Sequence, residues 1–293
     1  GTIGLTAQAL GRADDTERRA VIARALLLAI ACGAGLIILQ KPLLWAFFTA
    51  MAASPAVTET ADTYVSVRLL SAPAVFANFA ILGWLIGQAR TMTGLVLQIV
   101  INVANMALTV LFVTVFGWGV AGAATANVLA EYGGLIAGLA VVMTALRGRF
   151  GVSWQTVLDR AMIVKTFAIN RDIMIRTAAL VGSFAFFTRQ GAVGGDTVLA
   201  ANAILMNLVG VVAFFLDGFA TSAEQLGGQA VGARDEKAFR RAVLLSGFWA
   251  IAFGTLASLV FFGFGDHAIG LITTAEAVRA EALRYLPYAA LTP

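Results

Sequence analysis

The sequence has little charge and almost no cysteine or histidine. Charged residues make up 12% of its 293 residues and hydrophobic residues 60%, whereas a soluble domain carries about 25% charged residues. Too few charged side chains are present to cover a surface in water, so we expect an integral membrane protein. One Cys and one His exclude a disulfide framework, a zinc cluster and a haem ligand set.

Enzymatic and nucleic-acid functions lack the residues that they need. A membrane-embedded enzyme requires a convergent set of His, Asp or Cys side chains near one membrane face, and His267 lies in a predicted external loop. The net charge of +4 comes from basic residues in short loops between apolar runs. We therefore expect neither an enzyme nor a nucleic-acid partner.

Long apolar runs follow one another along the whole chain. Each is near or above the roughly 20 residues that a helix needs to cross the hydrocarbon core. The runs are 20–41, 64–87, 93–116, 119–146, 172–189, 198–220 and 242–265. They predict an all-α polytopic bundle with seven complete spans.

Lysine and arginine are concentrated in alternate loops. The loops at 8–20, 147–171 and 229–241 hold most of the 20 basic residues. Basic loops stay on the cytoplasmic side of a membrane. We therefore expect these three loops to be cytoplasmic in a multi-pass protein of the inner (plasma) membrane.

Two segments of the sequence are nearly the same. "QALGRADD" begins at Gln8 and "QAVGARDE" at Gln229, 221 positions later, and the same offset continues to match downstream. The match indicates an internal duplication whose period is too long for a solenoid. Six predicted spans separate the copies, an even number, so both have the same orientation. Two lobes related by a pseudo-twofold axis along the membrane normal are expected.

The duplication also predicts the domain organisation. Residues 1–150 form an N-terminal lobe and residues 151–293 a C-terminal lobe, with a linker at about 147–171 that includes a short interfacial helix in "SWQTVLDRAM". Completing each copy by the other adds the first helix and most of the second at the start, and the last part of the second lobe. We expect an internal fragment of a bundle with two parallel six-helix lobes.

Several segments resemble one transporter family. They are the paired motifs, "NVAN" (102–105), "VAGAATANVLAEY" (120–132), "NRDIMIRT" (170–177) and "LDGFA" (216–220). They are similar to the MATE family of multidrug and toxic-compound extrusion transporters, and within it to the DinF branch. The resemblance implies a V-shaped antiporter of twelve helices. Such a protein exports organic, often cationic, compounds by alternating access in exchange for H⁺ or Na⁺.

The resemblance sets further expectations. They are a monomer in the lipid bilayer, small organic substrates and no cofactor besides the coupling ion. No glycine-rich phosphate loop is present, so transport would draw on an ion gradient and not on ATP. The alternative is a lipid or oligosaccharide flippase of the same superfamily. A flippase would carry more cationic side chains in its central cavity, for which Arg68, Arg176 and Arg189 are available.

Four polar residues lie on one face of the predicted helix 93–116. Gln98, Asn102, Asn105 and Thr109 are spaced by four, three and four. An unsatisfied amide in the bilayer costs several kcal/mol, so this face contacts protein or a wet cavity. It either bonds neighbouring helices or forms a cation or proton site, and the family pattern favours the site. Thr109 stands where DinF-like proteins usually have Asp, and a threonine cannot titrate.

Acidic residues inside apolar spans are candidate functional groups. Asp217 and Glu224 are seven residues apart on one helix face. We expect Asp217 to bind the coupling ion or to titrate during transport, and Glu224 either to share that role or to be a solvated, Arg-paired acid. Glu131 lies in mid-span and is either functional or a structural partner of Arg68.

Other polar residues have weaker signals. Asp172 and Arg176 have the spacing of an intrahelical charge pair. Asn202 and Asn207 either bond neighbouring helices or line a cavity. A transporter of flat organic cations also needs some of its phenylalanines to face inward.

Overall fold

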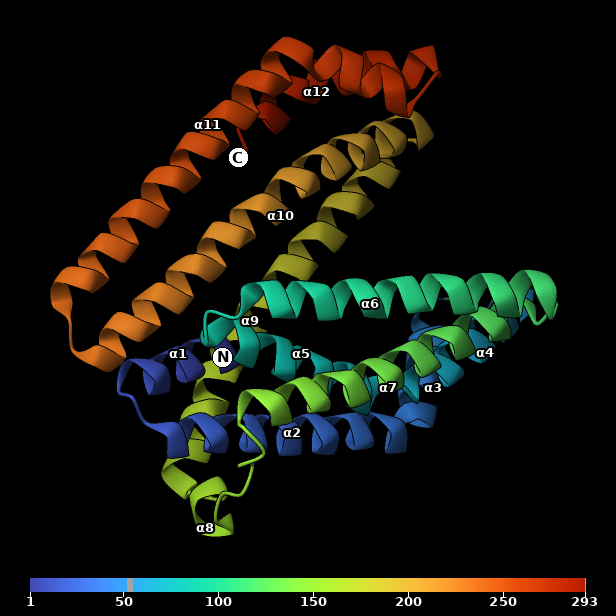
Figure 1. Ribbon diagram of the computed structural model, residues 1–293. Coiled ribbons are helices and arrows are strands. Elements are labelled where there is room, and N and C mark those ends of the chain that lie inside the picture. The colour runs from blue at the N-terminus through green and yellow to red at the C-terminus, as the bar shows by residue number, and fades with distance from the viewer. Residues whose placement is uncertain (52–54, 293) are drawn as a thin grey trace. The chain divides into compact units, whose positions relative to one another are not determined.

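The computed structural model describes residues 1–51 and 55–292 (Figure 1). Every regular element in these residues is a helix, which confirms the predicted all-α fold class. The chain divides into two compact units, Gly1–Ile163 and Val164–Pro293, called unit 1 and unit 2 below. Each has its own hydrophobic core.

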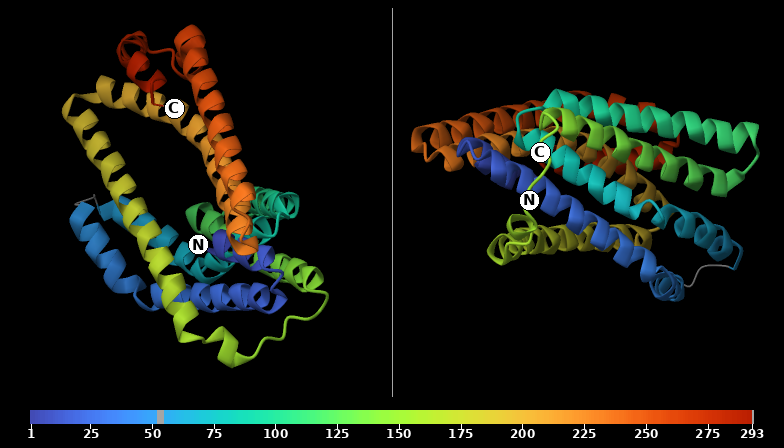
Figure 2. Two further views of the ribbon diagram at one scale, coloured as in Figure 1. Left: turned by 90° about the vertical axis from the view of Figure 1, so that its left-hand side faces the viewer. Right: turned by 60° about the horizontal axis from the view of Figure 1, so that its bottom comes forward.

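Unit 1 is organised around α5 (Ala72–Gly87). This helix packs against both α2 (Asp15–Ile38) and α7 (Gly119–Ala145), and α7 packs against α6 (Thr91–Val110). Figure 2 shows α6 and α7, drawn in green, running side by side. The other elements are α1 (Thr2–Gly11), α3 (Gln40–Met51), α4 (Pro55–Leu69), the π-helical turn η1 (Leu111–Val115) and α8 (Trp154–Val157). Fully buried core residues from α2, α5 and α7 include Ile22, Ile81, Trp84, Leu85 and Val142.

Helices α2 and α5 approach each other closely at Gly33. A Cβ atom built on Gly33 would lie 2.4 Å from the backbone N and Cα atoms of Pro73. A larger residue therefore cannot be accepted without moving one of the two helices. Gly35, on the same helix, has no such neighbour within 4 Å.

The repeated motif folds into the same turn twice. Ala13 and Arg234, separated by the repeat offset, both have left-handed φ angles, of 54° and 55°. Asp14 then accepts a hydrogen bond from the Glu17 backbone N–H at 2.9 Å, and Asp235 accepts one from Ala238 at the same distance. Each Asp satisfies an N–H group that the start of a helix leaves unpaired. The duplication seen in the sequence is thus matched in backbone geometry.

Unit 2 is a hairpin of two long helices with a third folded against it. Helix α10 (Asp196–Ala233) packs along α11 (Glu236–Ile272), and α12 (Glu276–Ala290) contacts both (Figure 1). Its core joins Ile204 and Leu205 of α10 to Ile269 of α11 and Leu286 of α12. Helix α9 (Arg160–Val193) precedes the hairpin, and its residues from Val164 on belong to unit 2.

Among the described residues, five helices are long and apolar enough to cross a membrane. They are α2, α6 with η1, α7, α10 and α11. A sixth span exists if Ala61–Leu69 and Ala72–Gly87, which meet at an angle of 54°, count as one. The prediction of seven complete spans is therefore corrected. Residues 172–189 are helical but lie in α9, where Asp172, Arg176 and Arg189 lower the hydropathy of the segment.

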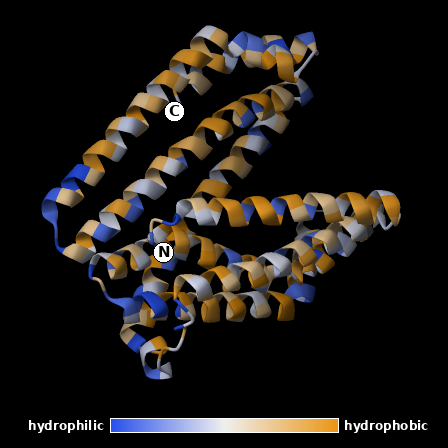
Figure 3. Ribbon diagram, viewed as in Figure 1, coloured by the Kyte–Doolittle hydropathy of each residue, from blue (hydrophilic) through white to orange (hydrophobic). Residues whose placement is uncertain are grey.

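Polar residues gather at helix ends, while helix faces are apolar. Figure 3 shows hydrophilic residues at the turn between α10 and α11 and hydrophobic residues along α6. On α6, Met92, Leu95, Ile99 and Val103 are each at least half exposed. A soluble protein rarely exposes such a continuous apolar face, whereas lipid tails would cover it.

We predict that Gly33→Ala destabilises the protein and that Gly35→Ala does not. Both changes improve helix propensity by about 1 kcal/mol, but only Gly33→Ala forces a methyl group into the Pro73 backbone. Overpacking of this kind costs about 1–3 kcal/mol. Thermal unfolding of the purified variants in detergent micelles measures the difference, and equal midpoints for the two variants would contradict the close approach.

Candidate functional site

A buried amide and an acid meet in the middle of unit 1. Asn78 of α5 is 8% exposed, and its Nδ2 atom donates to Oε2 of Glu131 at 2.8 Å and to the Glu131 backbone carbonyl at 2.9 Å. Glu131 lies halfway along α7, one of the candidate spans. The packing of α5 on α7 thus places a half-buried carboxylate in mid-span with one side-chain donor bound to it.

Two amide oxygens without donors lie on residues of this region of α5 and α7. The Asn78 Oδ1 atom is buried and has no hydrogen-bond partner within the described residues, and the same is true of Asn127 Oδ1. Asn127 is one turn before Glu131 on the same face of α7. A buried acceptor without a donor is costly, by about 1–3 kcal/mol. Two amide oxygens and a carboxylate therefore form a site that a proton or a hard cation would satisfy.

The polar stripe of α6 reaches the same level in part. Ile101 lies against Gly134 and Leu97 against Gly138, so α6 and α7 run antiparallel in this register. Continuing the register by one turn brings Asn105 level with Glu131, and by a second turn brings Thr109 level with Asn127.

The other two residues of the stripe lie elsewhere. Gln98 lies next to Leu97 and therefore near Gly138 of α7, about two turns from Glu131, and Asn102 is exposed. The register of α6 and α7 therefore places two of the four predicted residues near the levels of Glu131 and Asn127. Asn78 and Asn127 were not predicted from the sequence.

Glu131 is not bonded to Arg68. The Arg68 Nη1 atom donates to Ser71 Oγ at 2.6 Å, at the break between α4 and α5. Ion pairs among the described residues do not join Arg68 to Glu131. Of the two interpretations of Glu131, the structural pair with Arg68 is thus absent, and Asn78 holds the carboxylate.

The candidate residues of α10 are not gathered into one site. Asp217, Glu224 and Asn207 are exposed, and Asn207 donates to the Ala203 carbonyl of its own helix at 3.1 Å. Asn202 is half-buried and lies fifteen residues before Asp217, about 22 Å along a helix. The candidate polar residues of α10 therefore lie at separate positions along the helix.

The predicted pair of Asp172 and Arg176 is replaced by another. Arg171 donates from both Nε and Nη2 to Oδ1 of Asp172, at 3.1 and 3.0 Å. Arg171 reaches the Asp172 carboxylate with two N–H groups at once, an arrangement that favours it over Arg176. Both side chains are exposed, so the pair contributes little to stability.

An aromatic cavity lies within unit 2. Its volume is about 450 Å³, and α9, α10 and α12 contribute to its wall. The aromatic lining consists of Phe184, Phe187, Tyr285 and Tyr288, and Asn202 and Gln190 supply amides. Phe184 and Phe187 are therefore phenylalanines that line a cavity. Its size and apolar wall suit a small organic ligand.

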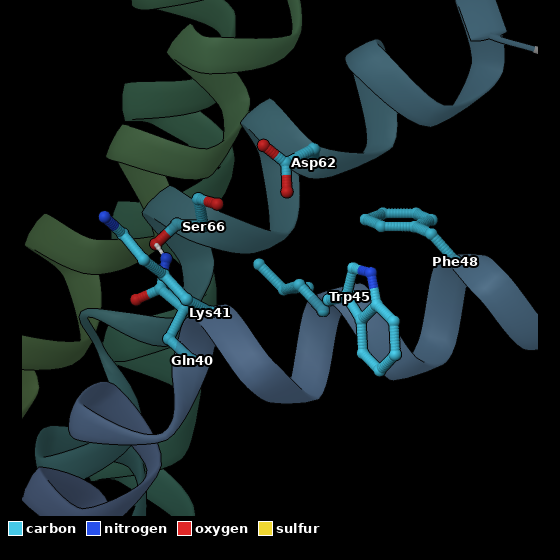
Figure 4. A pocket seen from close by; sticks show the side chains of 7 residues that line it. Gln40, Lys41, Trp45, Phe48, Asp62 and Ser66 are labelled. Atoms are coloured by element: carbon cyan, nitrogen blue, oxygen red, sulfur yellow. Dashed lines mark hydrogen bonds between the residues drawn. The ribbon is translucent and has the colours of Figure 1, made fainter.

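A second cavity, in unit 1, lies between α3 and α4 (Figure 4). It measures about 510 Å³ and combines the rings of Trp45 and Phe48 with the charges of Lys41 and Asp62. Two of the lining residues are joined by a hydrogen bond, in which Gln40 Nε2 donates to the Ser66 carbonyl at 3.2 Å. These residues were not predicted from the sequence, in which the available signal was Asp62 just before an apolar run.

No metal-ligating cluster accompanies these sites in the part of the chain that the structure describes. Within residues 1–51 and 55–292, no group of three or more His, Cys, Asp or Glu side chains could hold a metal ion. A cation in unit 1 would therefore be bound by amide oxygens and one carboxylate.

The chain matches one family over most of its length. The family model MatE matches residues 1–111 and 173–292. DNA damage-inducible protein F of Escherichia coli (strain K12) is 37% identical over 298 residues, covering 100% of this chain and 64% of the relative. Multidrug and toxin extrusion protein 1 of Homo sapiens is 26% identical, covering 75% of this chain and 39% of that protein. The chain thus spans less than two thirds of the length of these relatives.

Solved structures with the same fold are transporters. A MOP superfamily transporter from Pyrococcus furiosus has a TM-score of 0.84 at 20% identity, covering 100% of this chain and 67% of that chain. A MATE protein in the straight conformation has a TM-score of 0.85 at 20% identity, covering 99% and 66%. A bent conformation gives 0.83 at 19% identity, covering 99% and 65%. At these identities the likeness concerns the fold.

We predict that Asn78→Ala lowers the free energy of unfolding by about 1–3 kcal/mol, because the half-buried Glu131 carboxylate loses its side-chain donor. Asn207→Ala is the matched control, since this exposed amide bonds only its own helix, and its effect should stay within about 0.5 kcal/mol. Unfolding titrations in detergent micelles compare the two. An equal loss in both variants would contradict the assigned contact.

Proposed function

Because the chain belongs to the MatE family, whose members are transporters and not enzymes, we propose that the whole protein is a secondary active exporter. It moves small organic compounds, often cationic, out of the cell in exchange for H⁺ or Na⁺. The predicted resemblance to the DinF branch is confirmed by the whole-chain match to DNA damage-inducible protein F. The helical spans agree with a multi-pass membrane protein.

The observation that carries ion coupling is the contact between Asn78 and Glu131. The Glu131 carboxylate and the unpartnered amide oxygens of Asn78 and Asn127 are acceptors that lack a positively charged partner. A proton on Glu131, or a sodium ion among the oxygens, satisfies them. Asn105 and Thr109, at the same level, supply further uncharged oxygens. Loading and release of this cation then drive the exchange.

Substrate binding is supported by the aromatic cavity of unit 2. Phe184, Phe187, Tyr285 and Tyr288 present ring faces that attract organic cations without strict shape requirements. Asn202 orients a ligand by hydrogen bonding. The name of the human relative, multidrug and toxin extrusion protein 1, agrees with varied organic substrates. Asp217 and Glu224 remain predicted ion-coupling residues of this unit.

Alternating access is supported by the parallel repeat. Two lobes with the same orientation can rock against each other around a central site, and a related MATE protein has been crystallised in straight and bent conformations. We further propose two lobes at 1–150 and 151–293. The proposed location is the inner membrane, with the loops at 8–20, 147–171 and 229–241 in the cytoplasm and a monomer as the working unit.

The test uses the full-length protein in inside-out vesicles and follows uptake of ethidium under an imposed proton gradient or an imposed sodium gradient. One of the two gradients should drive uptake. Glu131→Gln should reduce that uptake by about tenfold or more, equivalent to about 1.4 kcal/mol, because an amide neither titrates nor carries charge. Asp217→Asn, in parallel, tests the second acid.

Glu276→Gln is the matched control, because this exposed acid lies in the first turn of α12. It should transport as the unmodified protein does. Normal uptake by Glu131→Gln would remove Glu131 from the coupling site. Folded protein that transports ethidium under neither gradient would overturn the exporter and favour the flippase, for which lipid translocation is the assay.

A further inference from the structure

A polar cavity of unit 1 is lined by arginine side chains. Its volume is about 440 Å³, and it lies where the ends of α2, α5, α6 and α7 meet. The cationic lining consists of Arg18, Arg19, Arg90, Arg147 and Arg149. The lining contains one acid, Asp15, so five positive charges face one negative charge, and the formal net charge is +4.

Neighbouring acids do not neutralise this surplus. Asp15 forms an ion pair with Arg18 at 2.9 Å. Asp14 caps the start of α2 through the Glu17 backbone, and the Glu17 carboxylate pairs with Arg24 at 3.2 Å. Within the described residues the other four arginines form no ion pair, so like charges gather at this cavity and an anion bound there would lower their repulsion.

Three donors around the cavity are buried and unused. Arg18 Nε, Arg19 Nε and Gln88 Nε2 have no hydrogen-bond acceptor in the part of the chain that the structure describes. A buried donor without an acceptor is rare in native proteins. These unpaired N–H groups lie on residues of a cationic wall, and a ligand with several acceptor oxygens and negative charge would suit that wall. A phosphate group has these properties, and guanidinium groups bind it in a forked geometry.

The turn itself does not require this charge. In the second copy of the repeat, Arg18 is replaced by Phe239, yet the backbone turn and its Asp cap are the same. The Phe239 ring packs 3.6 Å from the Cβ position of Gly227. An apolar residue therefore serves the fold at this position. Arg18 in the first copy therefore needs an explanation other than folding, whereas its neighbour Arg19 is retained as Arg240 in the second copy.

The position of the cavity indicates a lipid. Helices α2, α6 and α7 are candidate spans, and the arginines lie at their ends, which is the level of phospholipid headgroups. From Arg90 the exposed apolar face of α6 leads away through Met92, Leu95 and Val96, along which acyl chains can lie. Basic pockets between membrane helices bind anionic headgroups in this manner.

We propose that this cavity binds the phosphate group of an anionic phospholipid, with the headgroup held by the arginines and the acyl chains along α6. The site is separate from the proposed ion site, since Arg147 lies sixteen residues beyond Glu131, about 24 Å along the helix direction. The proposal does not depend on which ion or substrate is transported.

The test measures the thermal unfolding midpoint of the full-length protein in detergent as lipid is added. Phosphatidylglycerol should raise the midpoint, while phosphatidylcholine, which carries no net charge, should do so much less. In the double variant R19Q/R147Q the apparent affinity for phosphatidylglycerol should fall by about tenfold or more. The variant R240Q/R241Q is the matched control, because these exposed arginines occupy the second copy of the motif, and it should respond as the unmodified protein does.

Inorganic phosphate is the third ligand. If it raises the midpoint as much as phosphatidylglycerol at equal concentration, the site belongs to soluble phosphate and the lipid assignment is overturned. Equal responses to both lipids, or an undiminished response of R19Q/R147Q, overturn the site altogether. If the double variant does not fold, R149Q replaces it, since Arg149 is an exposed residue after the end of α7. A weakened response to phosphatidylglycerol supports the proposal, and an unchanged response overturns it.

Discussion

A polar group inside hydrocarbon needs a partner within the protein, and this requirement governs the rest of the structure. Helices satisfy the backbone groups of each span internally, so the described regular structure is entirely helical. Charged residues gather at turns such as that between α10 and α11, where water or headgroups receive them. The few polar side chains left in mid-span must then find one another. Asn78 and Glu131 do so across the contact between α5 and α7.

The same requirement explains what could be predicted from the sequence. Hydropathy along the chain is one-dimensional information, and it located the long helices α2, α6, α7, α10 and α11, although α10 and α11 extend well beyond the predicted runs 198–220 and 242–265. The spacing of Asn105 and Thr109 placed them on one face because the helical period is regular. The repeat was also visible, since its two turns retain the same Gly and Asp residues.

Contacts between distant segments could not be predicted in this way. Asn78 lies in a run that is otherwise apolar, and its partner is 53 positions away. The aromatic cavity needs Tyr285 and Tyr288 from α12 together with phenylalanines of α9, and no sequence period relates them. The break between α4 and α5 is set by Arg68 bonding Ser71, a local contact that hydropathy does not register. The preference of Asp172 for Arg171 likewise depends on side-chain geometry.

Unit 1 contains two kinds of buried polar atoms without hydrogen-bond partners, and the two kinds lie at different levels of its helices. Besides Thr6 Oγ1, the unpartnered buried atoms of the described part of unit 1 are acceptors in mid-span, the amide oxygens of Asn78 and Asn127, and donors at the helix ends, on Arg18, Arg19 and Gln88. A bilayer offers few cations at its centre except those that a protein carries through, but it offers phosphate anions at its surface. The unpaired acceptors thus lie where a transported cation would pass, and the unpaired donors lie where phosphate headgroups are present. The mid-span set suits an ion that comes and goes, while the set at the helix ends suits a ligand that stays.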